Sequence, residues 1–434
     1  MRRWRNVATA TLILVTIVYF VAQQQDKLPD AYQFGVPFQE SVDDEFGNAA
    51  SQQSSASLGN SEFTQKPPEI EVQPPPVLPN GDTPQEETPP TPASDLSGLP
   101  PSDDAQLPPV PDQAPVAFQP EFSFQQDLDL ELPVDSLKSF SNNKAHNYDP
   151  NGPASNVYAT FMATRNPSLK DPYYMAVHSL IYRVLWSPRS RTEKYAFVVF
   201  VGDFVTAEQR QLLTGAGAIV RELAPLEWNP NVEGIQHRWK DLFAKLNMWK
   251  ETDFFKILFL DADAFPVNNI DAMFDLAPQK TCIESKLAPE DHFLDGTSTC
   301  EPYVFAGVPQ NPGDPTNINI NVGSMVFSPS TLMHQRLLQN YLNFDKYDVT
   351  MAEQAFLNWQ FSINGAFPAT TLDREWGAAF PQEDEEGKLK VVHEKLWSDE
   401  RAWFRREWGE VWIEMTQFYM GDDFRGLRAS DGVA

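Results

Sequence analysis

Residues Phe254–Pro266 constrain the fold more than any other stretch of the chain. The first part, Phe254–Leu260, is nearly all apolar and rich in aromatic and branched side chains. Such a run is typical of a strand covered on both faces, as in a parallel sheet packed between helices. Two carboxylates, Asp261 and Asp263, follow the run directly. We therefore expect them at the carboxyl end of a strand, where open α/β sheets usually bind ligands.

The spacing of these two carboxylates is that of a cation site. Residues i and i+2 of an extended chain point to the same side, so Asp261 and Asp263 can converge on one ion. Carboxylate oxygens suit a hard cation such as Mg²⁺ or Mn²⁺, with a phosphate completing its coordination. The alternative is that both residues only end the strand and begin a turn. The residues themselves leave the two interpretations open.

The start of the chain predicts a membrane anchor, because three arginines precede the apolar run Val7–Ala22. A run of this length is near the lower limit for a spanning helix, and basic residues before it keep the N-terminus cytoplasmic. We expect a cytoplasmic tail over 1–6 and a signal anchor over 7–22, in a single-pass type II protein with a luminal catalytic domain. A short span suits the thin membranes of the early secretory pathway, so we expect the Golgi membrane. The alternative is a cleaved signal peptide, whose cleavage would place Phe20 where a small residue is needed.

Residues 23–150 have the composition of a disordered stem. They carry 22 Asp and Glu against 4 Lys and Arg, and 21 of the chain's 37 prolines. A segment with so much like charge and no hydrophobic periodicity cannot bury enough apolar surface to offset the entropy of ordering it. We interpret it as an extended spacer, with a concealed binding motif as the alternative. The net charge of the whole chain, −27, excludes a nucleic-acid partner.

Residues 156–434 alternate between strand and helix patterns, which predicts one α/β domain around a mostly parallel, doubly wound sheet. Thr206 is the expected N-cap of its helix, because a threonine hydroxyl can accept a hydrogen bond from the first turn. The strands are expected at Val157–Thr164, Tyr195–Val201, Ala218–Glu222 and Phe254–Leu260, and the helices at Tyr174–Trp186, Thr206–Thr214 and Trp239–Lys250.

Later stretches hold further candidate residues. The alternation from Asn317 to Ser330 predicts a strand with three asparagines on one face, which a solvated edge strand would equally explain. Thr350–Asn358 is predicted to be helical. His393 ends a short apolar run, and a single histidine in such a place is more often structural than a metal ligand. The three asparagines are Asn317, Asn319 and Asn321.

The cysteines and the last tryptophans favour structural roles. Cys282 and Cys300 are the chain's two cysteines, and an oxidising lumen favours a disulfide between them over two free thiols. The tryptophans near the C-terminus have roughly helical spacing and are expected to pack on the core, with an aromatic face for an acceptor as the alternative. They are Trp403, Trp408 and Trp412.

Taken in order, these motifs resemble the glycogenin-related retaining glycosyltransferases of family 8. The resemblance covers residues 156–397 and implies a GT-A fold, a UDP-sugar donor and a Mn²⁺ ion, with Mg²⁺ as a substitute. The motifs that carry it are Lys245-Leu-Asn-Met-Trp249, Asp261-Ala262-Asp263, Asn321-Val-Gly323, Glu353-Gln354-x-x-Leu-Asn358 and His393.

The resemblance also implies roles for individual residues. The metal ligands would be Asp261, Asp263 and His393. The donor would be held by Thr164, by Tyr173 or Tyr174, and by Lys245, Asp261, Ala262, Asp263, Asn321, Gly323 and Lys395. The catalytic residues would be Gln354, which lines the donor sugar, Glu353 and Lys245.

Three departures from the family's pattern bear on these roles. Glu353 stands where the family commonly has Asp, which affects how the sugar or its acceptor is held. The spacer between His393 and Trp397 is shorter than in the family, which puts the roles of Lys395 and His393 in question. Arg165-Asn166 replaces the usual Asn-Asp after the first strand.

The leading functional hypothesis is transfer of a sugar from UDP-N-acetylglucosamine or UDP-glucose to a glycan or glycoprotein acceptor in the secretory pathway. Front-face substitution by the acceptor is the expected mechanism, with a route assisted by Glu353 as the second option. The alternatives are a catalytically decayed binding or scaffold protein and an aspartyl-nucleophile phosphatase. The phosphatases prefer Thr or Val at the position that Phe265 occupies.

Overall fold

The computed structural model describes residues 118–231, 237–311 and 317–434. Within these ranges, no helix is both long and apolar enough to cross a membrane. The expected cytoplasmic tail, signal anchor and first part of the stem lie outside the described residues. All statements below concern the described part of the chain.

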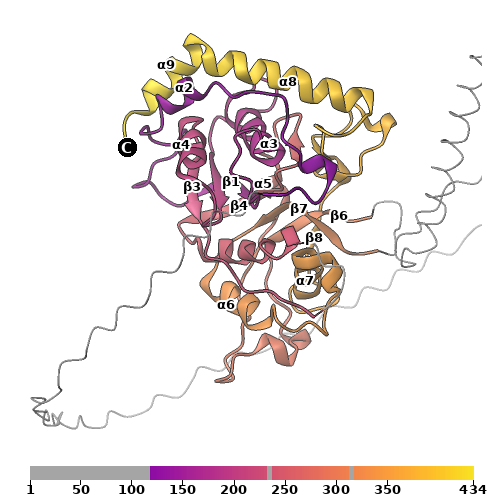
Figure 1. The fold of residues 1–434 in the computed structure, drawn as a ribbon. Helices are drawn as coiled ribbons and strands as arrows, with labels where there is room; N and C mark the ends of the chain where they lie inside the picture. The colour runs from indigo at the N-terminus through magenta and orange to yellow at the C-terminus, as the bar shows by residue number, and fades with distance from the viewer. Residues whose placement is uncertain (1–117, 232–236, 312–316) are drawn as a thin grey trace, which may run out of the picture. The chain divides into compact units, whose positions relative to one another are not determined.

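A seven-stranded sheet forms the centre of the domain, in the order β3-β2-β1-β4-β7-β6-β8 (Figure 1). The first four strands in this order pair in parallel, and β7 then runs antiparallel to both β4 and β6. The prediction of a mostly parallel sheet is confirmed, with a reversal at β7. The strands are β1 (Ser155–Met162), β2 (Ala196–Val201), β3 (Ile219–Glu222), β4 (Phe254–Leu260), β6 (Phe305–Pro309), β7 (Ile320–Phe327) and β8 (Thr370–Thr371).

A second, three-stranded sheet follows directly from the end of β4. It contains β5 (Ala264–Pro266), β10 (Val391–His393) and β9 (Ala378–Ala379), with β10 in the middle. Strand β10 pairs antiparallel with β5, which sets His393 opposite Ala264. The small sheet therefore brings a histidine from late in the chain next to the carboxylates that follow β4.

Helices cover the main sheet, and apolar side chains fill the space on each side of it (Figure 1). Strand β2 is buried along its whole length, as expected for a strand covered on both faces. The helices are α2 (Val134–Lys138), α3 (Pro172–Ile181), α4 (Ala207–Gly215), α5 (Met273–Leu276), α6 (Thr331–Asn340), α7 (Ala352–Gln360), α8 (Ala402–Met420) and α9 (Asp422–Asp431). Short helical turns are η2 (Ser123–Gln125), η3 (Tyr182–Trp186), η4 (His237–Trp239), η5 (Leu242–Lys250), η6 (Glu284–Lys286), η7 (Pro289–Asp291), η8 (Val349–Met351), η9 (Arg374–Trp376) and η10 (Glu383–Glu385).

Several local predictions are confirmed. Strand β4 has the predicted bounds, and the Thr206 side chain caps α4 by accepting from the backbone N–H of Gln209 at 3.2 Å. The tryptophans of α8 are buried against the core. The helical segment before β4 is 3-10 rather than α, since the bonds at its ends, Ala244 N–H to Asp241 O and Glu251 N–H to Met248 O, span three residues.

Two predicted boundaries are wrong. The stem was placed over 23–150, yet residues 118–150 pack on the domain, with Leu132 and Leu137 in the core. The average composition of the long segment concealed these few apolar side chains. The strand expected from Asn317 begins only at Ile320, because the Asn317 side chain accepts from the backbone N–H of Asn319 and forms a local turn instead.

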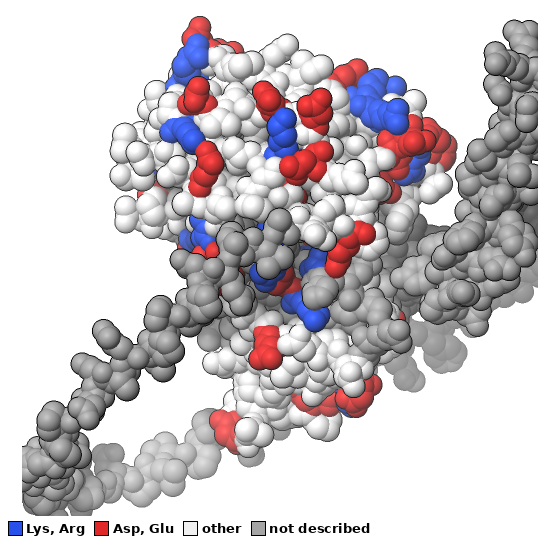
Figure 2. Space-filling model, viewed as in Figure 1, with Lys and Arg blue, Asp and Glu red and all other residues white. Residues whose placement is uncertain are grey.

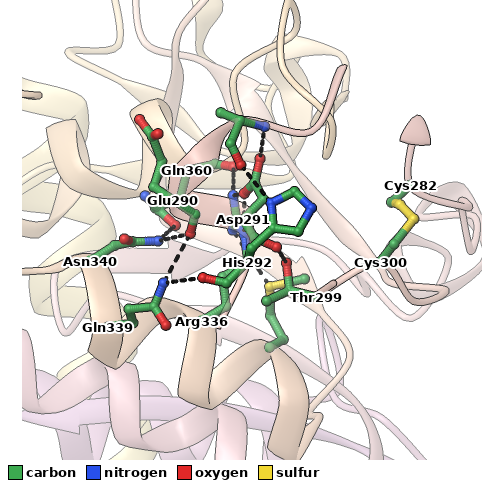
Figure 3. A network of polar contacts seen from close by, with 12 residues as sticks. Cys282, Glu290, Asp291, His292, Thr299, Cys300, Arg336, Gln339, Asn340 and Gln360 are labelled. Carbon is green, nitrogen blue, oxygen red and sulfur yellow. Dashed lines mark hydrogen bonds and ion pairs between the residues drawn. A yellow bond between two sulfur atoms is a disulfide. The ribbon is translucent and has the colours of Figure 1, made fainter. Parts of the chain in front are cut away.

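The loop between Cys282 and Cys300 folds onto α6 and α7 through a buried ion pair (Figure 3). The two cysteines form the predicted disulfide. Asp291 accepts from Arg336 Nε at 2.8 Å, and Arg336 also donates to the Gln360 carbonyl at 3.0 Å. Both charged side chains are almost fully buried. Because such charges are stable in the interior only when paired, this contact fixes the loop.

We expect Asp291→Ala to lower the free energy of unfolding by about 3–5 kcal/mol, because it leaves the buried Arg336 guanidinium without its carboxylate. Urea denaturation of the purified protein measures this change. The matched control is Asp295→Ala in the same loop, where the side chain is exposed and the change should stay within about 0.5 kcal/mol. Equal effects of the two substitutions would contradict the role of the ion pair.

Candidate functional site

Two carboxylates lie at the carboxyl end of β4, in the middle of the main sheet. The backbone N–H of Asp261 donates to the Gly323 carbonyl of β7 at 2.8 Å, and the chain then turns as Ala264 N–H donates to Asp261 O at 2.9 Å. Asp263 is held from the other side, since its carbonyl accepts from Glu394 N–H at 2.9 Å. Both sheets therefore fix the backbone that carries the carboxylates.

The carboxylates meet His393 in one cluster. One possible ligand atom from each of Asp261, Asp263 and His393 lies within 4.8 Å of the others. His393 Nε2 is 3.3 Å from Asp263 Oδ1 and 3.9 Å from Asp261 Oδ2. Among the described residues, His393 Nδ1 is buried and has no hydrogen-bond partner. Two carboxylates and an imidazole make a donor set that fits a divalent cation such as Mn²⁺.

Gly323 leaves the space that the cluster occupies. A Cβ atom at this position would lie 2.2 Å from His393 Cε1 and 2.7 Å from Asp261 Oδ2. The Asn321 side chain accepts from the backbone N–H of Gly323 at 2.8 Å and fixes the strand there. The Asn-x-Gly motif thus acts through the backbone of β7, and neither Asn321 nor Gly323 lines the cavity described below.

Two lysines neutralise the carboxylates. Lys245 Nζ is buried between Asp261 Oδ1 at 2.8 Å and Glu353 Oε1 at 2.9 Å. Burial lowers the pKa of Lys245, but the two carboxylates outweigh burial and raise it overall. Lys395 Nζ is 2.9 Å from Asp263 Oδ2. Burial raises the pKa of Asp263, but Lys395 and His393 outweigh it and hold that pKa well below its usual range.

With His393 neutral, as a metal ligand must be, the cluster carries a small negative charge. The carboxylates of Asp261, Asp263 and Glu353 exceed Lys245 and Lys395 by one charge when His393 is neutral. A divalent cation would reverse the sign and make the site attractive to an anion such as a diphosphate. Elsewhere, on the face drawn in Figure 2, acidic and basic side chains lie beside one another.

The cluster opens into a cavity of about 1060 Å³. Its wall contains most of the residues singled out from the sequence: Thr164, Tyr173, Lys245, Asp261, Ala262, Asp263, Glu353, Gln354, His393 and Lys395. Tyr174 is not among them, because its ring is fully buried in the core and its hydroxyl donates to the Gln209 carbonyl at 3.2 Å. Of the two tyrosines considered for the donor, only Tyr173 can contact a ligand in the cavity.

The start of α7 aims Glu353 and Gln354 at the cavity. Ala352, just before them, has a φ of 47°, a conformation that costs energy for a residue with a side chain. The Gln354 side chain accepts from the backbone N–H of Val322 at 3.2 Å, which ties α7 to β7. Local strain at such a place is common in sites where geometry matters more than stability.

Part of the cavity wall could not be identified from the sequence. Phe118, Gln119, Glu121 and Gln125 come from the segment that was interpreted as stem. Arg238, Trp239 and Met351 complete this side of the wall. The alternating leucines at 128, 130 and 132 were the available signal that the segment is ordered, and the surrounding acidic residues and prolines obscured it.

No protein-family model matches the chain. Among curated proteins, an uncharacterized protein of Schizosaccharomyces pombe is 28% identical over 291 residues, covering 58% of this chain and 78% of that protein. Galactinol synthase 6 of Arabidopsis thaliana is 30% identical over 249 residues, covering 55% of this chain and 70% of that protein. Galactinol synthase 1 of Solanum lycopersicum is 29% identical over 207 residues, covering 46% and 61%.

Two solved structures share distant similarity with this one. The glycosyltransferase GlyE of Streptococcus pneumoniae TIGR4 is 15% identical with a TM-score of 0.38, and the match covers 63% of this chain and 64% of that chain. Mouse xyloside xylosyltransferase 1 is 12% identical with a TM-score of 0.36, and the match covers 56% and 98%.

We expect Gly323→Ala to weaken Mn²⁺ binding by more than about tenfold, because the added methyl group displaces His393 and Asp261. The same overpacking should cost about 1–3 kcal/mol of stability. Electron paramagnetic resonance of added Mn²⁺ measures the affinity. The control is Gly409→Ala in α8, where a Cβ meets nothing within 4 Å and Mn²⁺ binding should not change. Unchanged Mn²⁺ binding in Gly323→Ala would contradict this placement of the site.

A second prediction concerns Asp171, which caps α3 and accepts from the Thr164 hydroxyl of the cavity wall at 3.1 Å. Burial raises the pKa of Asp171 to about 6. An acid whose pKa is raised on folding stabilises the fold only while protonated, so its contribution is lost as the pH rises from about 4 to 6. Between pH 4 and 7, the free energy of unfolding of wild type should fall by about 2–3 kcal/mol relative to that of Asp171→Asn, as measured by urea denaturation. A stability difference that stays constant with pH would contradict a protonated Asp171.

Proposed function

The chain belongs to the glycogenin-like glycosyltransferases of family 8, and on this premise we propose that it is a retaining, metal-dependent enzyme with a UDP-sugar donor. Its acceptor would be a glycan or a glycoprotein. One observation carries the proposal: Asp261, Asp263 and His393 converge at the end of β4, in the wall of a cavity that also contains two lysines. This is a site for a cation and an anionic ligand together.

The donor's diphosphate would lie at this cluster. Asp261, Asp263 and His393 would hold the metal, for which we propose Mn²⁺. A bound divalent ion supplies Lewis-acid stabilisation of the negative charge that grows on the leaving phosphate. Lys395 and Lys245 add fixed positive charge beside the same point, and their short contacts to Asp263 and Asp261 keep them in place.

The surroundings of Glu353 favour front-face substitution by the acceptor over a Glu353 nucleophile. Glu353 is almost fully buried, and its carboxylate accepts from Lys245 at 2.9 Å. A carboxylate held by an ammonium group is a weak nucleophile. Its position suits stabilisation of the positive charge that develops on the sugar ring, with Gln354 beside it in the cavity wall. The acceptor hydroxyl would then attack from the side on which UDP departs, which retains the anomeric configuration.

The donor sugar remains to be chosen among a few candidates. We propose UDP-N-acetylglucosamine or UDP-glucose, and the name of the galactinol synthases adds a galactose donor as a third candidate. A cavity of about 1060 Å³ lies at the upper end of the size range for small-molecule sites, which favours a donor and part of an acceptor together. A phosphatase is disfavoured, because the chain belongs to a family of glycosyltransferases.

We further propose that the enzyme works in the Golgi lumen as a single-pass type II membrane protein. The apolar run Val7–Ala22 and the proline-rich residues after it supply the anchor and the stem of this proposal. The disulfide between Cys282 and Cys300 is consistent with an oxidising lumen.

The proposal is tested by UDP release from a panel of UDP-sugars, with the full-length chain and either Mn²⁺ or EDTA. One donor should be hydrolysed in a metal-dependent way, and Asp263→Ala should reduce the rate by about a hundredfold or more because it removes a metal ligand. Asp295→Ala, which changes an exposed carboxylate in the loop between the cysteines, is the control and should keep the full rate. If no UDP-sugar is bound or hydrolysed with Mn²⁺ present, a decayed binding protein becomes the better account.

A further inference from the structure

Residues 118–131, which we call the strap, cross the edge of the cavity before the chain enters the domain core. We propose that the strap forms a part of the cavity wall that takes part in donor binding, and that Phe124 positions Lys395 and Trp397 for the nucleotide. This inference rests on the proposed function. It assigns a binding role to a segment whose composition suggests only a spacer.

The strap contacts the loop after β10 through Phe124. The Phe124 carbonyl accepts from Trp397 Nε1 at 2.9 Å. The Phe124 ring lies 5.3 Å from Lys395 Nζ, which contacts Asp263 at 2.9 Å. Lys395 is therefore held by a carboxylate of the metal cluster and by an aromatic ring of the strap. A shift of that ring would remove one of the two contacts that hold the lysine, which is expected to face the diphosphate.

The strap also contacts the loop after β1, through Asp127. Asp127 accepts from Asn166 Nδ2 at 2.9 Å and from the Ser168 hydroxyl at 2.6 Å. The backbone N–H of Leu128 donates to the Lys170 carbonyl at 2.9 Å. This loop follows Thr164 and Arg165, which line the cavity. The strap thus joins two walls of the cavity that the sheet alone does not connect.

The strap has a defined shape at the cavity, held by its own hydrogen bonds and ring contacts. The buried Gln125 side chain accepts from the backbone N–H groups of Glu121 and Phe122, both at 2.9 Å. The Phe122 ring stacks on Phe124 with 5.2 Å between centroids. Phe124 also meets Tyr173 edge-on at 6.4 Å, and Tyr173 lines the cavity. The turn closed by Gln125 and the stacked rings of Phe122 and Phe124 therefore fix the strap where it meets the cavity wall.

The short spacing between His393 and Trp397 explains why the strap contacts Trp397. Trp397 follows His393 by only four positions, so the segment between them forms only a tight turn and offers few side chains to support the tryptophan. Its tryptophan is instead held by Phe124 from the strap and by Tyr173, whose ring centroid is 5.2 Å away. In this chain the strap supplies the support that a longer loop could provide for itself.

The test compares three full-length variants with wild type. Phe124→Ala removes the ring but keeps the carbonyl, and Phe124→Tyr restores a ring. Asp127→Ala separates the strap from the loop after β1 without touching the cavity. The matched control is Phe255→Ala, an exposed phenylalanine at the start of β4.

The readouts are the Kd for UDP in the presence of Mn²⁺ by calorimetry, the KM and kcat for the hydrolysed UDP-sugar, and the unfolding temperature. We expect Phe124→Ala and Asp127→Ala to raise both Kd and KM about threefold to tenfold, the value of a lost aromatic or polar contact. Their kcat and unfolding temperature should change little, and Phe124→Tyr should restore Kd. In wild type, UDP with Mn²⁺ should also slow hydrogen exchange of the strap amides.

Each other outcome is decisive. If wild type binds no UDP with Mn²⁺, the proposed function fails and this inference fails with it. If wild type binds UDP but Phe124→Ala and Asp127→Ala bind it equally well, only the role of the strap is overturned. If weaker binding in both variants follows a matching fall in unfolding temperature, the strap serves the stability of the fold alone and the inference is also overturned.

Discussion

The site depends on the mutual neutralisation of carboxylates and lysines in the wall of a cavity. Lys245 is almost completely buried, and so is Glu353, which makes their separation costly. Removing one partner would leave a buried charge unpaired, so the whole set is fixed in position by electrostatics. The set still lacks one positive charge when His393 is neutral. That deficit makes the site ready to accept a cation.

The topology of the domain explains how this set is assembled. Strand β4 lies between the parallel strand β1 and the reversed strand β7, and the chain after its carboxyl end enters β5 of the small sheet. Strand β7 approaches the cluster with Gly323, which offers a backbone carbonyl and no side chain. The small sheet adds His393 through the pairing of β10 with β5. The main sheet thus supplies the carboxylate of Asp261 with space beside it, and the small sheet supplies the nitrogen ligand.

The sequence predicts the parts of the site that depend on local spacing. Asp261 and Asp263 were found because a two-residue spacing after an apolar strand has a direct geometric meaning. The roles of Lys245 and His393 at the site rest on the family resemblance, since nothing local shows that residues so far apart meet. The choice between Tyr173 and Tyr174 needed the rotation of α3, which sets Tyr174 in the core.

The sequence predicts the fold less well where one residue pattern fits two kinds of local structure. The polar and apolar alternation after Asn317 suits a strand, but an asparagine can also bond its own backbone two residues on, and this turn prevails until Ile320. A helical pattern as short as Trp239–Lys250 cannot separate a period of 3.0 residues from one of 3.6, so it does not predict the 3-10 form of η5. The strap was missed for a different reason, because its few buried side chains were averaged with a long polar segment.

Contacts between distant parts of the chain connect these observations. Phe124 holds Trp397 across 273 positions of the chain, and Lys144 N–H donates to the Gly432 carbonyl at 2.9 Å. Arg428 of α9 donates to the Lys144 carbonyl at 2.8 Å and fixes the same region. The start and the end of the domain thus stabilise each other, and the cavity lies where one of these contacts is made. A site built in this way is complete only after both ends of the domain have folded.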